Sequence, residues 1–174
     1  MQPTKTKFTM GSSAGEEVQI QALGAGWAVD AASARKIWFE TRLQLDDVSG
    51  AGFFVGLASN NGGEEVTMID SLEDGLGFIC ATGASPDIKS IGAKGNTETQ
   101  TDTGVNIADA TYVTLSYYFD GTTAHFYVNG DLKVSTTSNL PNDGTILFPS
   151  IEFTAVGTDQ DVTYLDYVRC CMER

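Results

Sequence analysis

Three acidic residues, Glu40, Glu152 and Asp166, stand in segments whose alternating polarity predicts β-strands, and they are the first candidates for acid–base chemistry. Hydrolysis of a glycosidic bond needs two carboxyl groups about 5–10 Å apart, usually presented from one strand face. None of the three has a second carboxylate two positions away in its strand. We therefore predict no catalytic pair and interpret the chain as non-enzymatic. The expected role of Glu40 is a pairing with Arg42 or another surface charge.

The single histidine and the three cysteines offer no other reactive group. His125 alternates with Phe126, which places it on the solvent or inter-subunit face, without a nucleophile or orienting acid nearby. Cys80, Cys170 and Cys171 lack Cys-x-x-Cys or histidine spacing, so we predict no zinc site. Adjacent strand residues point to opposite faces, so Cys170 and Cys171 are poorly placed to pair together. Reduced thiols are expected, and a bridge from Cys80 to either of the other two is the alternative.

Two acidic stretches keep calcium open as an alternative to the absence of any cofactor. Carboxylates between Asp70 and Asp74, or Asp159 and Asp161, supply the oxygen ligands that Ca²⁺ prefers, but neither stretch has the spacing of a ligand motif. The prediction is therefore no cofactor and no metal, with solvated acidic loops.

Four aromatic residues are the candidates for sugar binding, because sugars stack on exposed rings flanked by hydrogen-bonding groups. They are Trp27, Trp38, Tyr112 and Tyr118. We expect an inward packing role for each, so no binding site is assigned to them.

The elements that position these residues are short extended segments, and no convincing amphipathic helix interrupts them. Segment 36–45 alternates, with Ile37, Phe39, Thr41, Leu43 and Leu45 on one face, whereas 52–58 is the continuous apolar run of a strand covered on both sides. Asn129-Gly130 predicts a two-residue hairpin turn. We predict about ten strands, at 17–22, 36–45, 52–58, 76–82, 88–93, 112–120, 123–128, 131–135, 145–155 and 161–170. Residues 27–34 are predicted to be a connection, and the polar stretch 95–104 a loop.

Length and charge limit what such a chain can bind. Its 174 residues fit one domain with its own core. Ten basic and 23 acidic residues give a net charge of −13, which repels phosphate backbones and argues against nucleic acid. Residues 1–10 contain no apolar run of the length that a secretory signal needs, and no apolar stretch in the sequence approaches the length of a membrane span. We expect an arm over residues 1–15, whose candidate interface residues are Lys5, Lys7, Phe8 and Met10, and a single β-sandwich domain over residues 16–174.

A double hairpin gives the first resemblance to known proteins. Segment 117–130, YYFDGTTAHFYVNG, resembles the YDG…YVNG hairpins of concanavalin A-like and laminin-G-like jelly rolls. The order of further segments also fits that superfamily, at 38–42, 54–57, 149–151 and 165–168. The resemblance implies an all-β, two-sheet antiparallel jelly-roll sandwich. Glucanases of that superfamily carry Glu-x-Asp-x-Glu on one strand, and this pattern is absent here.

The end of the chain, 162–174, is similar to the DYV/IR…ER tail of structural proteins of tailed bacteriophages. That similarity implies a virion component, made in the host cytoplasm, that decorates or cements the capsid exterior. Its partners would be the major capsid protein and its own copies, in a homo-oligomer such as a trimer. The alternatives are a carbohydrate-binding, lectin-like module or host-binding fibre component, and an enzyme acting on polysaccharide through Glu40 or Glu152.

Overall fold

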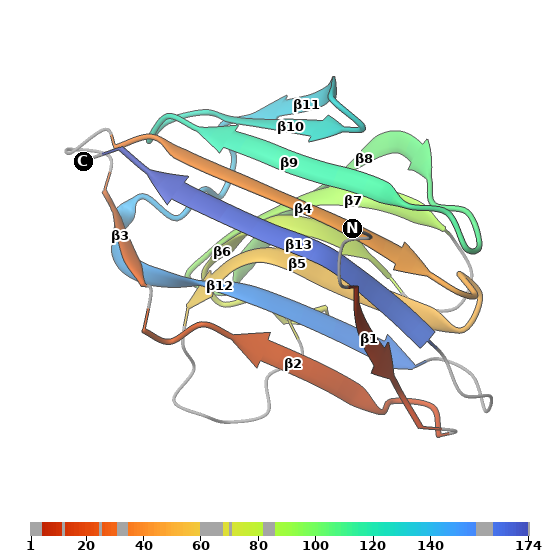
Figure 1. Ribbon diagram of the computed structural model, residues 1–174. Helices are drawn as coiled ribbons and strands as arrows, with labels where there is room; N and C mark the ends of the chain where they lie inside the picture. Colours follow the sequence, from red (N-terminus) through yellow and green to blue (C-terminus); the bar gives the residue numbers. More distant parts are fainter. Residues whose placement is uncertain are drawn as a thin grey trace.

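A computed structural model shows a sandwich of two antiparallel β-sheets (Figure 1). It describes residues 5–11, 13–24, 26–30, 35–59, 68–69, 71–81, 86–155 and 162–173. No helix occurs in these ranges, and accordingly none that could cross a membrane. The all-β class predicted from the alternating segments is therefore confirmed, as is the two-sheet jelly-roll sandwich that the resemblance implied.

The first sheet, sheet A, has six strands. All of its neighbouring strands pair antiparallel. Their order across the sheet is β1 (Thr6–Thr9), β13 (Val162–Met172), β4 (Ile37–Leu45), β9 (Val113–Phe119), β10 (Ala124–Val128) and β11 (Asp131–Thr136).

The second sheet, sheet B, has seven strands. Six follow one path, in the order β2 (Glu17–Gln21), β12 (Asp143–Ala155), β5 (Ala51–Ser59), β6 (Gly75–Cys80), β7 (Asp87–Lys94) and β8 (Thr97–Asn106). The seventh, β3 (Trp27–Asp30), pairs with β12 beside the path.

The main core lies between the sheets and is built from the inward positions of both. In β4, every second residue from Ile37 to Leu45 is buried, as the alternation predicted. Phe39 stacks on Tyr117 of β9, with ring centroids 5.2 Å apart. Phe126 of β10 meets Phe78 of sheet B edge to face at 5.2 Å. These aromatic contacts join the two layers at the centre of the sandwich.

The predicted hairpin at Asn129-Gly130 is present. Both residues have positive φ, 53° and 87°, as a type I′ turn requires. The backbone N–H of Thr114 is bound by the Asn129 side chain at 3.0 Å, which also ties the turn to β9.

Two segments that we expected to be connections are strands. Residues 95–104 are polar and predicted a loop, yet Thr97–Asn106 forms β8 at the edge of sheet B. An edge strand pairs on one side only and needs few apolar residues, which is why the apolar pattern is missing. Trp27, placed in a connection, begins the short strand β3.

The described part of the expected N-terminal arm is paired within its own chain. Thr6–Thr9 pairs antiparallel with β13, near the start of that strand (Figure 1). Phe8 packs inward with its ring 5.4 Å from that of Phe153, and Met10 is 2% exposed in the core. Of the predicted interface residues, only Lys5 and Lys7 therefore remain exposed.

Candidate functional site

The outer face of sheet A carries a row of aromatic and polar side chains that the core does not use. Cross-strand pairing places Trp38 of β4 beside Tyr118 of β9, and Tyr118 beside His125 of β10. The next row holds Glu40, Ser116 and Tyr127. The three rings and His125 are half-buried, because they alternate with fully buried core residues. We call this surface the aromatic face.

The rings of the aromatic face support one another. Trp38 of β4 and Tyr127 of β10 lie diagonally on either side of β9, with ring centroids 6.0 Å apart. Tyr118 stacks on His125 with ring centroids 6.3 Å apart, and a 2.8 Å hydrogen bond between Nδ1 of that imidazole and the Ser135 hydroxyl holds the ring in place. Mutually packed rings lose little freedom when a ligand arrives, so they form a prepared stacking surface.

A carboxylate and a guanidinium border these rings. Glu40 accepts a 2.9 Å hydrogen bond from the Tyr167 hydroxyl and lies 3.8 Å from Arg169. Arg169 is 71% exposed and lies over the Tyr167 ring, 4.6 Å from its centroid. Burial, followed by the hydrogen bond to Glu40, raises the pKa of Tyr167, so its hydroxyl is a donor at neutral pH. Together these groups provide donors and acceptors beside the stacking rings.

A second cluster extends the aromatic face along β4. Arg42 forms a 2.7 Å ion pair with Asp166, whose side chain is 8% exposed. The Arg42 guanidinium also lies 4.3 Å from the centre of the Tyr112 ring, and the Lys5 ammonium lies 4.6 Å from that centre. The pairing of β13 with β4 shifts by one residue between Leu165 and Tyr167, as in a β-bulge. The extra residue is Asp166, which lies next to Arg42.

The outer face of sheet B is covered by the chain itself. Met68, Ile69 and Leu72 are buried there in a second apolar cluster. They pack with outward residues of the sheet, namely Phe54, Ala58, Ile79, Ile91 and Ala93. We call residues 68–72 the covering segment, of which residue 70 lies outside the described ranges. It buries these outward side chains of β5, β6 and β7.

Two carboxylates from distant strands hold the covering segment in place. Glu152 of β12 is fully buried and accepts a 2.6 Å hydrogen bond from the backbone N–H of Met68. Glu98 of β8 accepts one of the same length from the N–H of Leu72. Glu152, one of the candidate acids, is thus a structural residue beneath a covered face.

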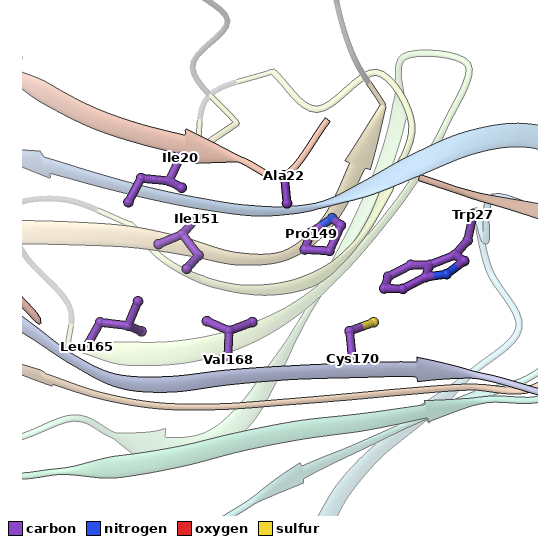
Figure 2. Close-up of a pocket in the computed structure, with 8 residues that line it drawn as sticks. All are labelled: Ile20, Ala22, Trp27, Pro149, Ile151, Leu165, Val168 and Cys170. Carbon is purple, nitrogen blue, oxygen red and sulfur yellow. The ribbon is translucent and has the colours of Figure 1, made fainter. Parts of the chain in front are cut away.

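A cavity of about 440 Å³ opens at one side of the sandwich, between the edges of the two sheets. Figure 2 shows two rows of side chains facing each other across it, Ile20, Ala22, Pro149 and Ile151 from sheet B, and Leu165, Val168 and Cys170 from β13. Trp27 closes one end (Figure 2). We call this cavity the seam pocket. Its lining is apolar, so it lacks the hydrogen-bonding groups that a sugar requires.

The three candidate carboxylates are divided between the two sheets. Glu40 and Asp166 lie on the outer face of sheet A, engaged with Tyr167 and Arg42 respectively, whereas Glu152 belongs to sheet B. Glu40 lies beside Arg169, the second of the two partnerships that we anticipated for it. No described strand presents Glu-x-Asp-x-Glu.

Cys80, Cys170 and Cys171 form no disulfide, so the alternative of a bridge from Cys80 to Cys170 or Cys171 is not realised. Burial raises the pKa of Cys80 to about 11 and that of Cys170 to about 12. Within the described ranges, no three His, Cys, Asp or Glu side chains converge on a metal position. Asp70, Asp159 and Asp161, candidates for calcium, lie outside those ranges.

The expectation that all four aromatic candidates pack inward is wrong for Trp38 and Tyr118, and also for Tyr112, whose ring contacts Arg42 on the outer face. Their neighbours in sequence, Phe39 and Tyr117, occupy the inward positions, so alternation sends Trp38 and Tyr118 outward. Trp27 does pack against the core. Tyr127 and Arg169 were missed, although the same alternation around Phe126 predicts an outward Tyr127.

No family model and no curated protein matches this sequence. Solved structures do match the fold. The potassium-bound carbohydrate recognition domain of Emp46p is 9% identical, over 94% of this chain and 82% of that one, with a TM-score of 0.68. The non-specific endo-β-1,3(4)-glucanase SCLam, of family GH16, is 12% identical over 97% of this chain and 71% of that one, with a TM-score of 0.67. The carbohydrate-binding module CBM66 from Bacillus subtilis is 12% identical over 91% of this chain and 83% of that one, with a TM-score of 0.60.

These likenesses establish the jelly-roll sandwich, a fold that carbohydrate-recognising domains share with glycosidases. At such low identity they assign neither activity to this chain.

Proposed function

We propose that this protein is a non-catalytic carbohydrate-binding domain, and that the aromatic face binds the glycan. The observation that carries the proposal is the half-exposed set of Trp38, Tyr118 and Tyr127 on neighbouring strands, bordered by polar groups. Sugar rings stack their C–H faces on aromatic side chains while their hydroxyls bind flanking donors and acceptors. Glu40, Tyr167 and Arg169 supply those groups.

Two features favour this face over the rest of the molecule. The equivalent surface of sheet B is occupied by the covering segment, and the seam pocket is apolar. Two of the structural neighbours are named for carbohydrate recognition or binding, which gives the proposal a precedent on the same fold. A binding role is proposed in preference to hydrolysis because Glu40 and Asp166 are held by other side chains of the face.

The proposal is tested by measuring binding to a panel of soluble and insoluble polysaccharides, by affinity electrophoresis and pull-down. We expect one class of glycan to bind the wild type, and Trp38→Ala and Tyr118→Ala each to weaken binding at least about tenfold, equivalent to ~1.4 kcal/mol. Ile146→Ala is the matched control, because Ile146 is an exposed apolar residue, 53% accessible, on β12 of sheet B. Failure to bind any member of the panel, or unchanged binding by Trp38→Ala, would contradict the proposal.

A second candidate function is a coat protein on the exterior of a bacteriophage particle, bound to the major capsid protein and to its own copies. The similarity of segment 162–174 to phage structural proteins favours it, as does the net charge of −13, which suits a surface facing away from DNA. Exposed Lys5 and Lys7 are then the remaining arm residues for contact. Stoichiometric co-purification with particles, without glycan affinity, would favour this candidate over the first.

A further inference from the structure

One edge of β13 is only partly covered. On one side the strand pairs with β4 from Thr163 to Met172. On the other side β1 pairs with it only from Val162 to Leu165. No described strand lies against that edge over 166–172. In an antiparallel sheet, alternate residues direct their backbone N–H and C=O groups to opposite edges. This stretch therefore presents backbone groups suited to another strand.

The seam pocket lies directly beneath this uncovered edge. Its β13 side is formed by Leu165, Val168 and Cys170, the inward residues of the strand (Figure 2). A strand added beside β13 would direct every second side chain inward, in the same sense as Val168 and Cys170. Those side chains would enter the pocket, whose volume lies in the range of ligand sites, about 300–1,000 Å³.

The strand β1 shows what this edge accepts. It pairs antiparallel with the first part of β13, opposite Thr163 and Leu165 at its inward positions. At one of these positions Phe8 inserts between the sheets and reaches Phe153 of sheet B. The second part of the edge also lies above an apolar space, but no strand of the described ranges pairs with its backbone.

We propose that the uncovered edge of β13 and the seam pocket together form a strand-addition site for an extended peptide segment of another protein. The segment would run antiparallel to β13, as β1 does, with bulky apolar side chains opposite Val168 and Cys170. The site shares strand β13 with the aromatic face, because Tyr167 and Arg169 lie on the outer side of the same stretch. It uses the backbone edge and the inward side chains Val168 and Cys170 instead, so it represents a second binding function that is tested without glycan.

The chemistry of the site favours a peptide over other occupants. A small apolar molecule or acyl chain would fill the pocket and leave the backbone edge unused, and the pocket has no polar side chain to orient it. A second copy of this chain would bring another net charge of −13 to the edge. Pairing of β13 with its own copy about Arg169 would also place two guanidinium groups opposite each other.

The test uses a fluorescent peptide about eight residues long, a usual strand length, in which threonine alternates with valine and phenylalanine. The control peptide has serine at every apolar position. We expect the first peptide alone to bind the full chain by fluorescence anisotropy, and to slow amide exchange over 166–172 while exchange in β10 and β11 is unchanged.

Two adjacent cysteines give matched variants of the protein. Cys170→Phe fills the pocket from within and should weaken peptide binding at least about tenfold. Cys171→Phe places the same ring on the exposed outer face and should leave binding unchanged. Ile20→Lys gives an independent check at a position that is already 42% exposed, so folding should tolerate it. Thermal unfolding shows that each variant is folded.

Three results would overturn the proposal. The first is absence of peptide binding, or binding that Cys170→Phe and Ile20→Lys leave unchanged. The second is a concentration-dependent dimer that protects the same β13 amides without peptide, which would make the edge a self-association surface. The third is displacement of the peptide by a fatty acid that binds the pocket more tightly, which would identify an apolar small molecule as the occupant.

Discussion

The two sheets use their outer faces in opposite ways. On sheet A, outward residues such as Trp38 and Tyr118 are half-exposed and lie beside polar groups. On sheet B, outward residues such as Phe54 and Ile79 are fully buried under the covering segment. One face is therefore available to bind a ligand, and the other serves as a second core.

The difference is encoded in the period of the strands. In β4 the residues alternate between buried and half-buried along all nine positions, whereas in β5 eight of nine positions are buried. A strand covered on both sides can be apolar throughout, because neither face meets water. A continuous apolar run thus marks a strand beneath a cover, and an alternating strand marks a face that remains open for function.

The largest effect is expected from a truncation on the covered face. Phe54→Ala removes a fully buried ring from the second apolar cluster and should lower the free energy of unfolding by about 3–5 kcal/mol. Trp38→Ala deletes a larger side chain on the open face but should cost only about 1 kcal/mol, because water already reaches that ring. Urea denaturation of both variants measures the difference. Equal losses would show that the two faces are not energetically distinct.

A smaller effect is expected from the carboxylates that hold the covering segment. Glu152→Ala leaves the buried N–H of Met68 without this acceptor and should cost about 1–3 kcal/mol. Glu98→Ala removes an equivalent bond from a half-buried position, where water can replace the lost acceptor, so its cost should be lower.

Hydrogen exchange measures both carboxylate variants locally. The amides of Met68 and Leu72 should exchange faster, each in the variant that lacks its own acceptor. If the amides of the covering segment exchanged at wild-type rates in Glu152→Ala, Glu152 would not be the residue that holds the cover in place.

The fold was predictable because alternation is a local property. The inward residues of β4, β9 and β10 followed from a period of two, and Asn129-Gly130 identified the hairpin between β10 and β11. The polar edge strand β8 was not predictable in this way. Its pairing with β7 depends on the neighbouring strand, and its own residues carry no apolar period.

The site was less predictable than the fold, because it depends on which face of each sheet is covered. The outward position of Trp38 follows from alternation, but its contact with Tyr127 requires the register of β4, β9 and β10. The hydrogen bond that Glu152 accepts comes from Met68, which lies 84 residues earlier in the chain. Such contacts between distant segments leave no local signal.

The smallest effect on stability is expected from two aspartates near strand ends, Asp120 in sheet A and Asp143 in sheet B. Here we expect the two sheets to behave alike. Asp120, in the turn between β9 and β10, accepts hydrogen bonds from both the N–H and the hydroxyl of Thr122 and from the N–H of Thr123. These bonds hold the pKa of Asp120 below its usual value, as bonds from Thr145 do for Asp143 at the start of β12 in sheet B.

A carboxyl group whose pKa is lower in the folded than in the unfolded state stabilises the protein at pH values above its unfolded pKa. This contribution is lost as the pH falls through the folded pKa. Because both carboxyl groups are close to water, each should contribute no more than about 0.5 kcal/mol to the free energy of unfolding. Asp120→Asn and Asp143→Asn should therefore destabilise the protein slightly at pH 7, and the difference from wild type should shrink below pH 4 to the same extent in both. Urea titrations at pH 7 and pH 3 test this, and a pH-dependent loss confined to one sheet would show that the difference between the sheets extends beyond their faces into their turns.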